Sequence, residues 1–186
     1  MPGLGSRKEN HVDFADAVAA AGMAALALDL RGHTDSAGRL DGGVLDDLLA
    51  GLDALAAAGH APLGLRGSSM GGMLALHAAA GDRRVRAVVA LCPARPEGLA
   101  RRIGDDWPLA MPLAPAVARH DGVARGYWHA TGDQSVPWGG TLALAGVTPP
   151  PMRLRVALGG GHNTLQHDPA VIAETVAFLA EHLGAP

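Results

Sequence analysis

Two kinds of hydrophobic pattern alternate along the chain. In four segments the apolar residues recur at helical spacing, as Leu45, Leu48, Leu52 and Leu55 do, and we expect helices there. Five shorter runs are almost continuously apolar, which is typical of strands buried on both faces. The expected helices span residues 10–21, 44–58, 70–80 and 169–183, and the expected strands span residues 23–30, 62–66, 85–91, 126–131 and 152–158.

This alternation predicts the fold class. Strands and helices in turn indicate an α/β fold of three layers (αβα), with a mostly parallel sheet between two layers of helices. A chain of 186 residues is long enough for about one domain, so we expect residues 1–186 to form a single domain. Prolines in residues 94–123 interrupt this alternation of strands and helices. We expect them to form a short cap-like excursion over the carboxyl edge of the sheet, where such folds bind ligands.

Composition and charge exclude several classes of protein. The net charge of −3 at pH 7 provides no basic field for nucleic acid. The single cysteine, Cys92, excludes a disulfide framework and a CxxC redox or zinc site. No run reaches the ~18 consecutive apolar residues of a membrane span, and the N-terminus lacks the apolar core of a signal peptide. We therefore expect a cytoplasmic protein that binds neither nucleic acid nor a membrane.

The pentapeptide at residues 67–71, GSSMG, has the form G-x-S-x-G. It follows an expected strand and begins an expected helix, which is the setting of a nucleophile elbow. Its glycines leave room for a strained turn that exposes the hydroxyl of Ser69. The N–H of Met70 would lie at a helix N-terminus, where partial positive charge stabilises an oxyanion. The alternative is an ordinary glycine-rich turn between a strand and a helix.

A serine nucleophile needs a base, and the base needs an orienting acid. His162 follows the last expected strand, and Asp133 follows the strand before it. Three loops at the carboxyl ends of three strands therefore carry Ser69, Asp133 and His162 in the chain order typical of this kind of site. Neither residue is convincing alone, because the chain has nine histidines.

The chain resembles the α/β-hydrolase family, near its small serine esterases and dienelactone-hydrolase-like members. The resemblance runs from about Gly3 to the C-terminus and rests on GSSMG, on DLRGHTDS at residues 29–36, on GDQSVP at 132–137 and on GGGH at 159–162. It implies that Ser69 is the nucleophile, Asp133 the acid and His162 the base, and that no metal or cofactor is needed. Dienelactone hydrolases carry cysteine at the position of Ser69, so the resemblance does not imply that this chain acts on their substrate.

The N-terminus departs from the family pattern. Family members have two or three strands before a His-Gly oxyanion loop, whereas residues 1–6 resemble only the remainder of that loop, with Pro2 in place of the histidine. The resemblance assigns the N–H of Leu4 to the oxyanion hole beside that of Met70. The fold is thus expected to be N-terminally shortened, with a gap in the sheet. Either the strand at 23–30 closes this gap by pairing with 62–66, or an upstream segment is missing from this sequence.

Other polar and aromatic residues have less specific interpretations. Trp107, Met111 and Trp138 are candidates to line a substrate pocket, and the first two fit the core of the excursion equally well. We expect His33 to stabilise its loop, His77 to pack within its helix and Cys92 to be a small buried residue. For His167 we expect a surface or hydrogen-bonding role, since a spacing of five residues from His162 does not suit a metal pair. Asp168 is expected to cap the last helix, which has Pro169 in its first turn.

From these residues we expect a serine hydrolase that cleaves small carboxylic esters or thioesters through a Ser-His-Asp triad and an acyl-enzyme. Its substrate would be a small-molecule ester, and it would act as a monomer or homodimer. Peptidases and acyltransferases share the same triad, so they remain alternatives. A further alternative is a non-catalytic scaffold, or a truncated hydrolase that a partner completes along an open sheet edge.

Overall fold

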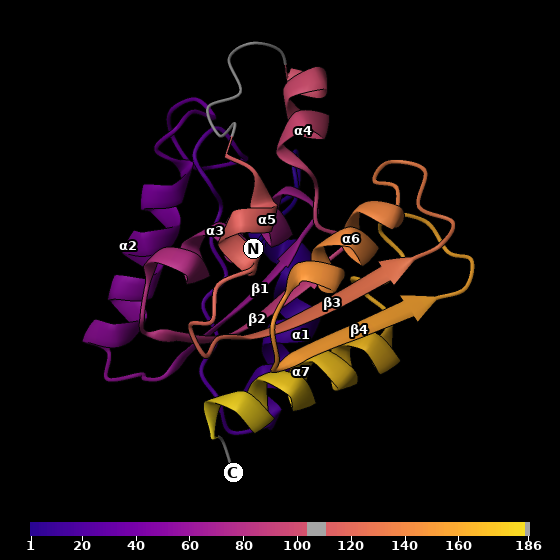
Figure 1. The fold of residues 1–186 in the computed structure, drawn as a ribbon. Coiled ribbons are helices and arrows are strands. Elements are labelled where there is room, and N and C mark those ends of the chain that lie inside the picture. The colour runs from indigo at the N-terminus through magenta and orange to yellow at the C-terminus, as the bar shows by residue number, and fades with distance from the viewer. Residues whose placement is uncertain (104–110, 185–186) are drawn as a thin grey trace.

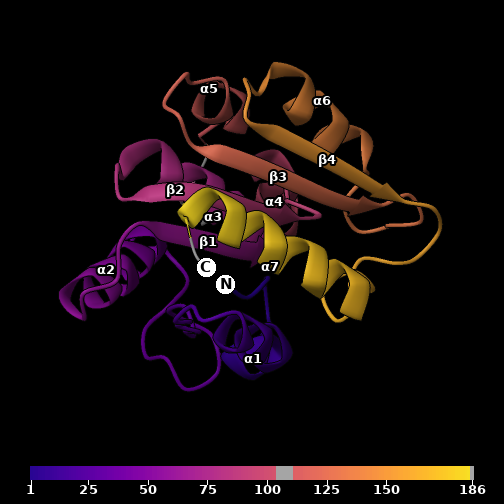
Figure 2. The same cartoon turned by 90° about the horizontal axis from the view of Figure 1, so that it is seen from below.

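A parallel sheet of four strands forms the centre of the molecule in the computed structural model, which describes residues 1–103 and 111–184. The strands lie side by side in chain order, from β1 at one edge to β4 at the other (Figures 1 and 2). Each pair of neighbours is parallel. Their carboxyl ends therefore meet at one end of the sheet. The strands are β1 (Leu63–Ser68), β2 (Val85–Leu91), β3 (Ala124–Ala130) and β4 (Met152–Ala157).

Helices cover both faces of this sheet. Helix α7 packs on β1, β2 and β3, and α1 packs on α7. Helix α3 packs on β1 and β2, α6 packs on β3 and β4, and α5 lies between α3 and α6 on that second face. The bounds are Lys8–His11 for the 3₁₀ helix η1, then α1 (Val12–Ala20), α2 (Val44–Ala57), α3 (Met70–Gly81), α4 (Pro96–Ile103), α5 (Leu113–Val117), α6 (Gly139–Val147) and α7 (Pro169–Leu183).

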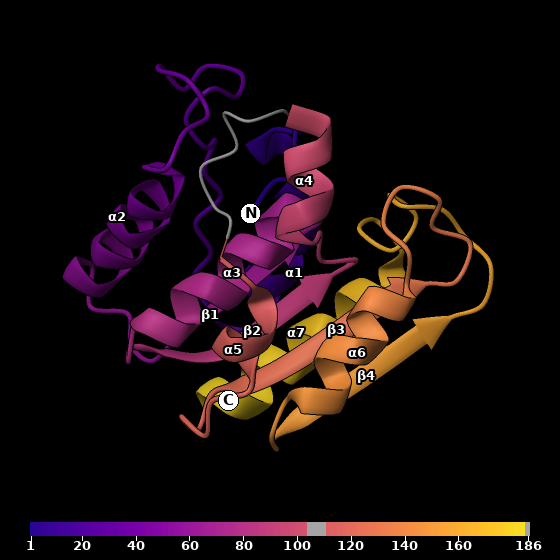
Figure 3. The same ribbon diagram turned by 45° about the horizontal axis from the view of Figure 1, so that its top comes forward.

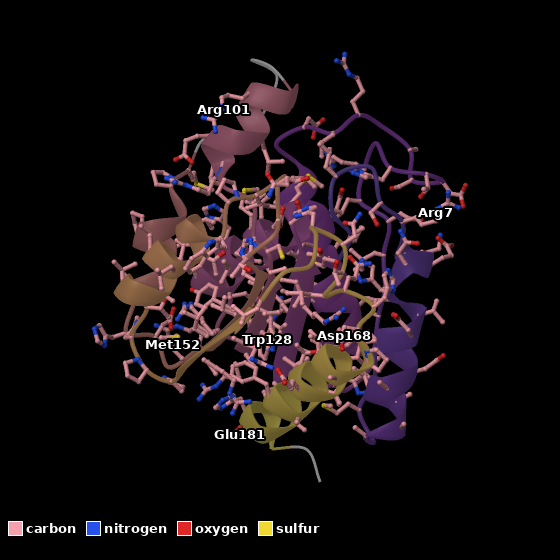
Figure 4. All side chains as sticks on the ribbon, turned by 90° about the vertical axis from the view of Figure 1, so that its right-hand side faces the viewer. Arg7, Arg101, Trp128, Met152, Asp168 and Glu181 are labelled. Carbon is pink, nitrogen blue, oxygen red and sulfur yellow. The ribbon has the colours of Figure 1, made fainter. Side chains whose placement is uncertain are left out.

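Burial follows the layers. The sheet residues and α3 form the larger core, in which Met70, Met73, Leu74 and Leu76 have no exposed surface. Because α3 is buried all round, it carries no polar stripe at all. The opposite face has a smaller core, built around Trp128 of β3 and Phe178 of α7, whose rings meet edge to face at 5.7 Å. Figure 4 shows Trp128 beside α7, and its indole N–H donates to Glu174.

Most expected elements are confirmed within a few residues, one expected strand is absent, and one longer helix was not anticipated. Helix α6 was not expected, because its run of small and apolar residues has little amphipathic signal. The run at 23–30 was expected to be a strand, and its pairing with 62–66 was one of two alternatives for the gap in the sheet, but it forms no strand and does not pair with β1. Gly22 at φ +76° turns the chain after α1, and the segment then runs opposite the free edge of β1, with a cavity between them.

In the described part of residues 94–123, the chain forms two short helices, α4 and α5, of which α5 packs on α3 and α6. Leu99, Leu113 and Val117 are buried in the larger core, and the cap-like character of the excursion stays a prediction. Among the described residues, no helix is both long and apolar enough to span a membrane.

Candidate active site

Ser69 occupies a strained turn between β1 and α3. Its backbone has φ +54° and ψ −116°, a conformation that residues with a side chain rarely adopt. Three backbone hydrogen bonds hold it there. The Ser69 N–H donates to Leu91 O at 2.9 Å, and the Ser69 carbonyl accepts from the N–H groups of Met73 and Ala94 at 3.1 and 3.0 Å. Strain of this kind persists only where the surroundings impose it, and it is concentrated at functional sites.

Glycines on both sides of Ser69 permit the turn. A Cβ atom at Gly67 would collide with the backbone of Gly71, the second residue of α3. A Cβ atom at Gly71 would lie 2.5 Å from Met1 O and 2.6 Å from Pro2 O. Position 67 therefore lets the helix start directly over the strand, and position 71 lets the N-terminal segment cross the start of that helix.

The N-terminal loop lies against Ser69. A Cβ atom at Gly3 would be 3.3 Å from Ser69 Cβ, so the two backbones are in close contact. Leu4 follows in a tight turn, which the hydrogen bond from Ser6 N to Gly3 O closes at 3.1 Å. The loop that carries Leu4, whose N–H was expected to contribute to the oxyanion hole, thus lies beside Ser69. Met70, the other expected donor, begins α3 directly after Ser69.

Asp133 and His162 are joined by a hydrogen bond. His162 Nδ1 lies 2.6 Å from Asp133 Oδ2, although the two residues are 29 positions apart in sequence. Asp133 lies in the loop after β3 and His162 in the loop after β4, and these loops lie beside each other at the carboxyl end of the sheet (Figures 1 and 3). The His162 side chain is 18% exposed and that of Asp133 is fully buried, so solvent reaches the base and not the acid.

Hydrogen bonds keep Asp133 ionised. Burial alone would raise the pKa of this carboxyl group. The bond with His162 and the N–H groups of Ser135 and Val136, both 2.8 Å from Oδ1, outweigh burial and hold the pKa of Asp133 below its usual value. A carboxylate that accepts from His162 Nδ1–H leaves Nε2 of that ring free to accept a proton, which is the arrangement a general base requires.

Two residues next to Asp133 were not anticipated as neighbours of the site. His129 is completely buried on β3, with Nε2 3.4 Å from Asp133 Oδ2 and 2.9 Å from Val136 O, and with Nδ1 2.7 Å from Thr141 Oγ1. Burial lowers the pKa of His129, so this ring is neutral and donates from Nε2. Its position inside an apolar strand gave no sign of this contact, because buried histidines usually serve packing.

Cys92 is the second unanticipated neighbour. It was expected to be a small buried residue, and it is fully buried. Its φ is +41°, and its Sγ lies within 4.8 Å of a carboxylate oxygen of Asp133 and of a ring nitrogen of His162. It follows β2, which lies between β1, the strand before Ser69, and β3, the strand before Asp133. Burial, reinforced by the Asp133 carboxylate, raises the pKa of the thiol to about 12, so it is protonated and a poor metal ligand.

The three candidate pocket residues have different outcomes. Trp107 lies outside the described residues. Met111 and Trp138 are 49% and 37% exposed, and Trp138 is the residue before α6. Their exposure is compatible with a pocket rim, and their role in binding stays a prediction.

The remaining polar candidates have structural partners. His33 is buried and bonds to Arg31 O through Nδ1 at 3.1 Å, as expected for a loop-stabilising residue. His77 is buried within α3, as expected for a packing residue. His167 bonds to Asp13 through Nδ1 at 2.7 Å. Asp168 accepts from two N–H groups in the first turn of α7 and is therefore its N-cap (Figure 4).

Comparison with known proteins gives one family match and several structures of similar fold. The family model described as "Serine aminopeptidase, S33" matches residues 1–121. Among solved structures, the α/β-hydrolase GrgF from Penicillium sp. sh18 superimposes with a TM-score of 0.79 at 20% identity, over 98% of this chain and 88% of that one. No curated protein sequence matches the chain.

Two further solved structures share the fold at similar distance. The esterase Est1E from Butyrivibrio proteoclasticus, solved with ferulic acid, gives a TM-score of 0.75 at 20% identity, over 99% of this chain and 88% of that one. The monoacylglycerol lipase of Paleococcus ferrophilus gives 0.76 at 17% identity, over 98% and 93%. At these identities the likeness concerns the fold alone.

Proposed function

Because the chain belongs to the serine aminopeptidase S33 family of α/β-hydrolases, we propose that it is a serine hydrolase that cleaves small carboxylic esters or thioesters. The family and the fold make it a hydrolase in general terms. The nucleophile and the substrate class are the parts that we propose here.

In the proposed reaction, His162 Nε2 removes the hydroxyl proton of Ser69, and Ser69 Oγ attacks the acyl carbonyl. The N–H groups of Met70 and Leu4 stabilise the oxyanion. His162 then gives its proton to the leaving alcohol or thiol, and an acyl-Ser69 ester remains. Water, deprotonated by His162, hydrolyses this ester and regenerates the hydroxyl. Throughout, Asp133 holds the tautomer of His162 and stabilises the imidazolium.

The observation that carries this proposal is the 2.6 Å hydrogen bond between Asp133 Oδ2 and His162 Nδ1. It forms at the same end of the sheet as the strained Ser69. The short excursion, whose α4 and α5 span eight and five residues, leaves little chain for a large lid, which supports a small acyl group.

Labelling with a fluorophosphonate probe tests whether Ser69 is activated. We expect a single covalent adduct by intact mass, mapped to the peptide that contains Ser69. The adduct should be absent in Ser69→Ala and in His162→Ala. Ser68→Ala is the matched control, since Ser68 is the adjacent buried serine on β1 and should not affect labelling. An adduct on another residue, or none on folded protein, would contradict the proposal.

The family description raises a second candidate, cleavage of an aminoacyl bond. Comparing p-nitrophenyl acetate with alanine p-nitroanilide separates the two activities. We expect turnover of the ester, with kcat/KM at least tenfold above that for the anilide. Faster turnover of the anilide would assign the chain to peptidases and leave the roles of Ser69, Asp133 and His162 unchanged.

A further inference from the structure

His129 is a fully buried polar residue beside the candidate site. It lies on β3, four residues before Asp133, and has no exposed surface. An apolar residue would fill this position at no cost in lost hydration, whereas a buried imidazole costs free energy unless its nitrogen atoms are hydrogen-bonded. Both nitrogen atoms are bonded, since Nδ1 lies 2.7 Å from Thr141 Oγ1 and Nε2 lies 2.9 Å from Val136 O. The ring therefore connects β3 both to α6 and to the loop that contains Asp133.

These two hydrogen bonds fix the tautomer of His129. Val136 O is a carbonyl oxygen and can only accept, so Nε2 carries the proton. Because burial lowers the pKa of the ring, the ring is neutral, and Nδ1 accepts from the hydroxyl group of Thr141. Thr141 is itself buried on α6, which packs over β3 and β4 (Figures 1 and 3). The chain of donors thus runs from α6 through His129 to the loop after β3.

The loop after β3 is bonded to side chains on both sides of Val136. The N–H of Val136 donates to Asp133 Oδ1 at 2.8 Å, and its carbonyl accepts from His129 Nε2. The N–H of Ser135 donates to the same carboxylate oxygen at 2.8 Å. His129 therefore holds the residue that itself holds the first oxygen of Asp133. The second oxygen, Oδ2, is the one that bonds to His162 Nδ1 at 2.6 Å.

His129 also lies beside that second oxygen, with its Nε2 3.4 Å from Asp133 Oδ2. Three titratable side chains face Asp133 from three elements: His162 from the loop after β4, His129 from β3 and Cys92 from the end of β2. Burial keeps Cys92 protonated and His129 neutral, because it raises the pKa of the thiol to about 12 and lowers that of the imidazole. Neither group adds a charge, so the Asp133 carboxylate is available to the imidazolium that forms at His162.

We propose that His129 is a positioning residue for the acid Asp133. Fixed by Thr141, its ring anchors Val136 and so holds Asp133 Oδ2 against His162 Nδ1. The assignment rests on the proposed function, in which His162 is the base. Its effect on the reaction is geometric, since a displacement of about 1 Å at a reacting group costs about 100-fold in rate. The competing interpretation is a core histidine that only fastens α6 to β3.

Two substitutions of His129 separate positioning from packing. In His129→Gln the side-chain NH₂ group takes the place of Nε2 and can still donate to Val136 O. In His129→Asn the shorter side chain ends near the place of Nδ1, so the bond to Val136 is lost and that to Thr141 is kept. We expect kcat for p-nitrophenyl acetate to fall by about 10- to 100-fold in His129→Asn and by less than about threefold in His129→Gln, with KM unchanged in both.

A spectroscopic readout tests the same point without turnover. The proton on His162 Nδ1 lies in a 2.6 Å hydrogen bond to a carboxylate, which moves its NMR signal far downfield. We expect this signal in the native chain and in His129→Gln, and its loss in His129→Asn. Its absence in His162→Ala assigns it. Failure of the proposed function would look different, as a native chain that shows the signal but is not labelled at Ser69 by the fluorophosphonate.

Thr141→Val removes the hydroxyl group that fixes the ring and changes the shape of the side chain little. We expect kcat to fall by about tenfold, because the ring can then rotate away from Val136. Thr175→Val is the matched control, since Thr175 is a fully buried threonine on α7 whose hydroxyl group donates to Ile172 O. It should leave kcat unchanged. Urea unfolding checks the fold of each variant, and if His129→Asn does not fold, the two threonine variants decide the question.

Three outcomes would overturn the proposal. The first is an equal kcat in His129→Gln and His129→Asn, which would make His129 a packing residue. The second is a folded native chain without the downfield signal, which would contradict the hydrogen bond that His129 is proposed to support. The third is a kcat for Thr141→Val equal to that of Thr175→Val, which would show that the site does not depend on the anchoring of the ring by α6.

Discussion

Two regions of the molecule differ in how their buried polar groups are satisfied. At the carboxyl end of the sheet, Asp133 forms three hydrogen bonds within the chain, with the N–H groups of Ser135 and Val136 and with His162 Nδ1. Along the free edge of β1, His11 and Arg66 are as deeply buried, but they retain nitrogen atoms without partners. The molecule thus has buried polar groups that are bonded within the chain and others that are not.

This difference separates two kinds of site. Groups that carry out chemistry must be held in one geometry before substrate arrives, so their supporting hydrogen bonds come from within the chain. Buried groups outside the chemistry can be left without hydrogen-bond partners, and the cost then appears as lower stability of the chain. The predictions below test the contrast, from the largest expected effect to the smallest.

Asp133→Asn should damage the site without unfolding it. The asparagine oxygen can still accept from Ser135 and Val136, but its NH₂ group would face His162 and favour the wrong tautomer. We expect kcat for p-nitrophenyl acetate to fall by about 10⁴-fold. Thermal unfolding should stay within a few degrees of that of the native chain. A loss of less than tenfold would show that Asp133 does not orient the base.

Gly67→Ala should disrupt the turn that holds Ser69. The added methyl group would collide with the backbone of Gly71, which cannot move away as a flexible side chain would. We expect the free energy of unfolding to fall by about 3 kcal/mol, as for overpacked buried positions, and labelling of Ser69 to be lost. Gly81→Ala is the control, since a methyl group there meets nothing within 4 Å. Equal stability of both variants in denaturant would contradict the strained-turn argument.

Burial of His11 should make the stability of the folded chain fall in acid. The folded chain holds the pKa of His11 near 2, well below its value of about 6.5 in the unfolded chain. Between these values the unfolded chain binds a proton that the folded chain does not, so stability falls as the pH drops below about 6.5. At pH 5 this one group costs about 2 kcal/mol.

His11→Phe should remove that part of the acid sensitivity. We expect urea unfolding of the variant to lose less stability than the native chain between pH 8 and pH 5. His60→Gln changes an exposed histidine that lines the cavity beside β1. This variant should lose stability between pH 8 and pH 5 as the native chain does. If His11→Phe and the native chain lose stability in parallel, the burial of a neutral imidazole is not the cause.

Asp168→Ala should have the smallest effect. The carboxylate caps α7 by accepting from Ala170 N at 2.8 Å and Val171 N at 3.3 Å. Its loss should lower the free energy of unfolding by about 1 kcal/mol, while Asp168→Asn should retain most of the cap. A stability equal to that of Asp168→Asn would show that the cap is replaced by water.

The sequence by itself determined the layers, the order of the strands along the chain and the loops that carry Ser69, Asp133 and His162. Apolar periodicity identifies elements because it reports burial, and the carboxyl ends of parallel strands converge on one edge whatever the side chains are. It also located the N-cap of α7, since capping depends on neighbours only two or three residues away.

Only the tertiary structure decided what lies beside these elements. Cys92 reaches Asp133 from the end of the neighbouring strand β2, and His129 reaches it from β3, four residues earlier. No local pattern distinguishes either from ordinary buried residues. The run at 23–30 is apolar enough for a strand, yet it stands opposite β1 without pairing, because a ladder needs a neighbour at hydrogen-bond distance and not merely a strand-forming sequence. Burial of Met1, His11 and Arg66 at one end of that gap is likewise a property of the packing, since charges far apart in the chain meet only when the chain is folded.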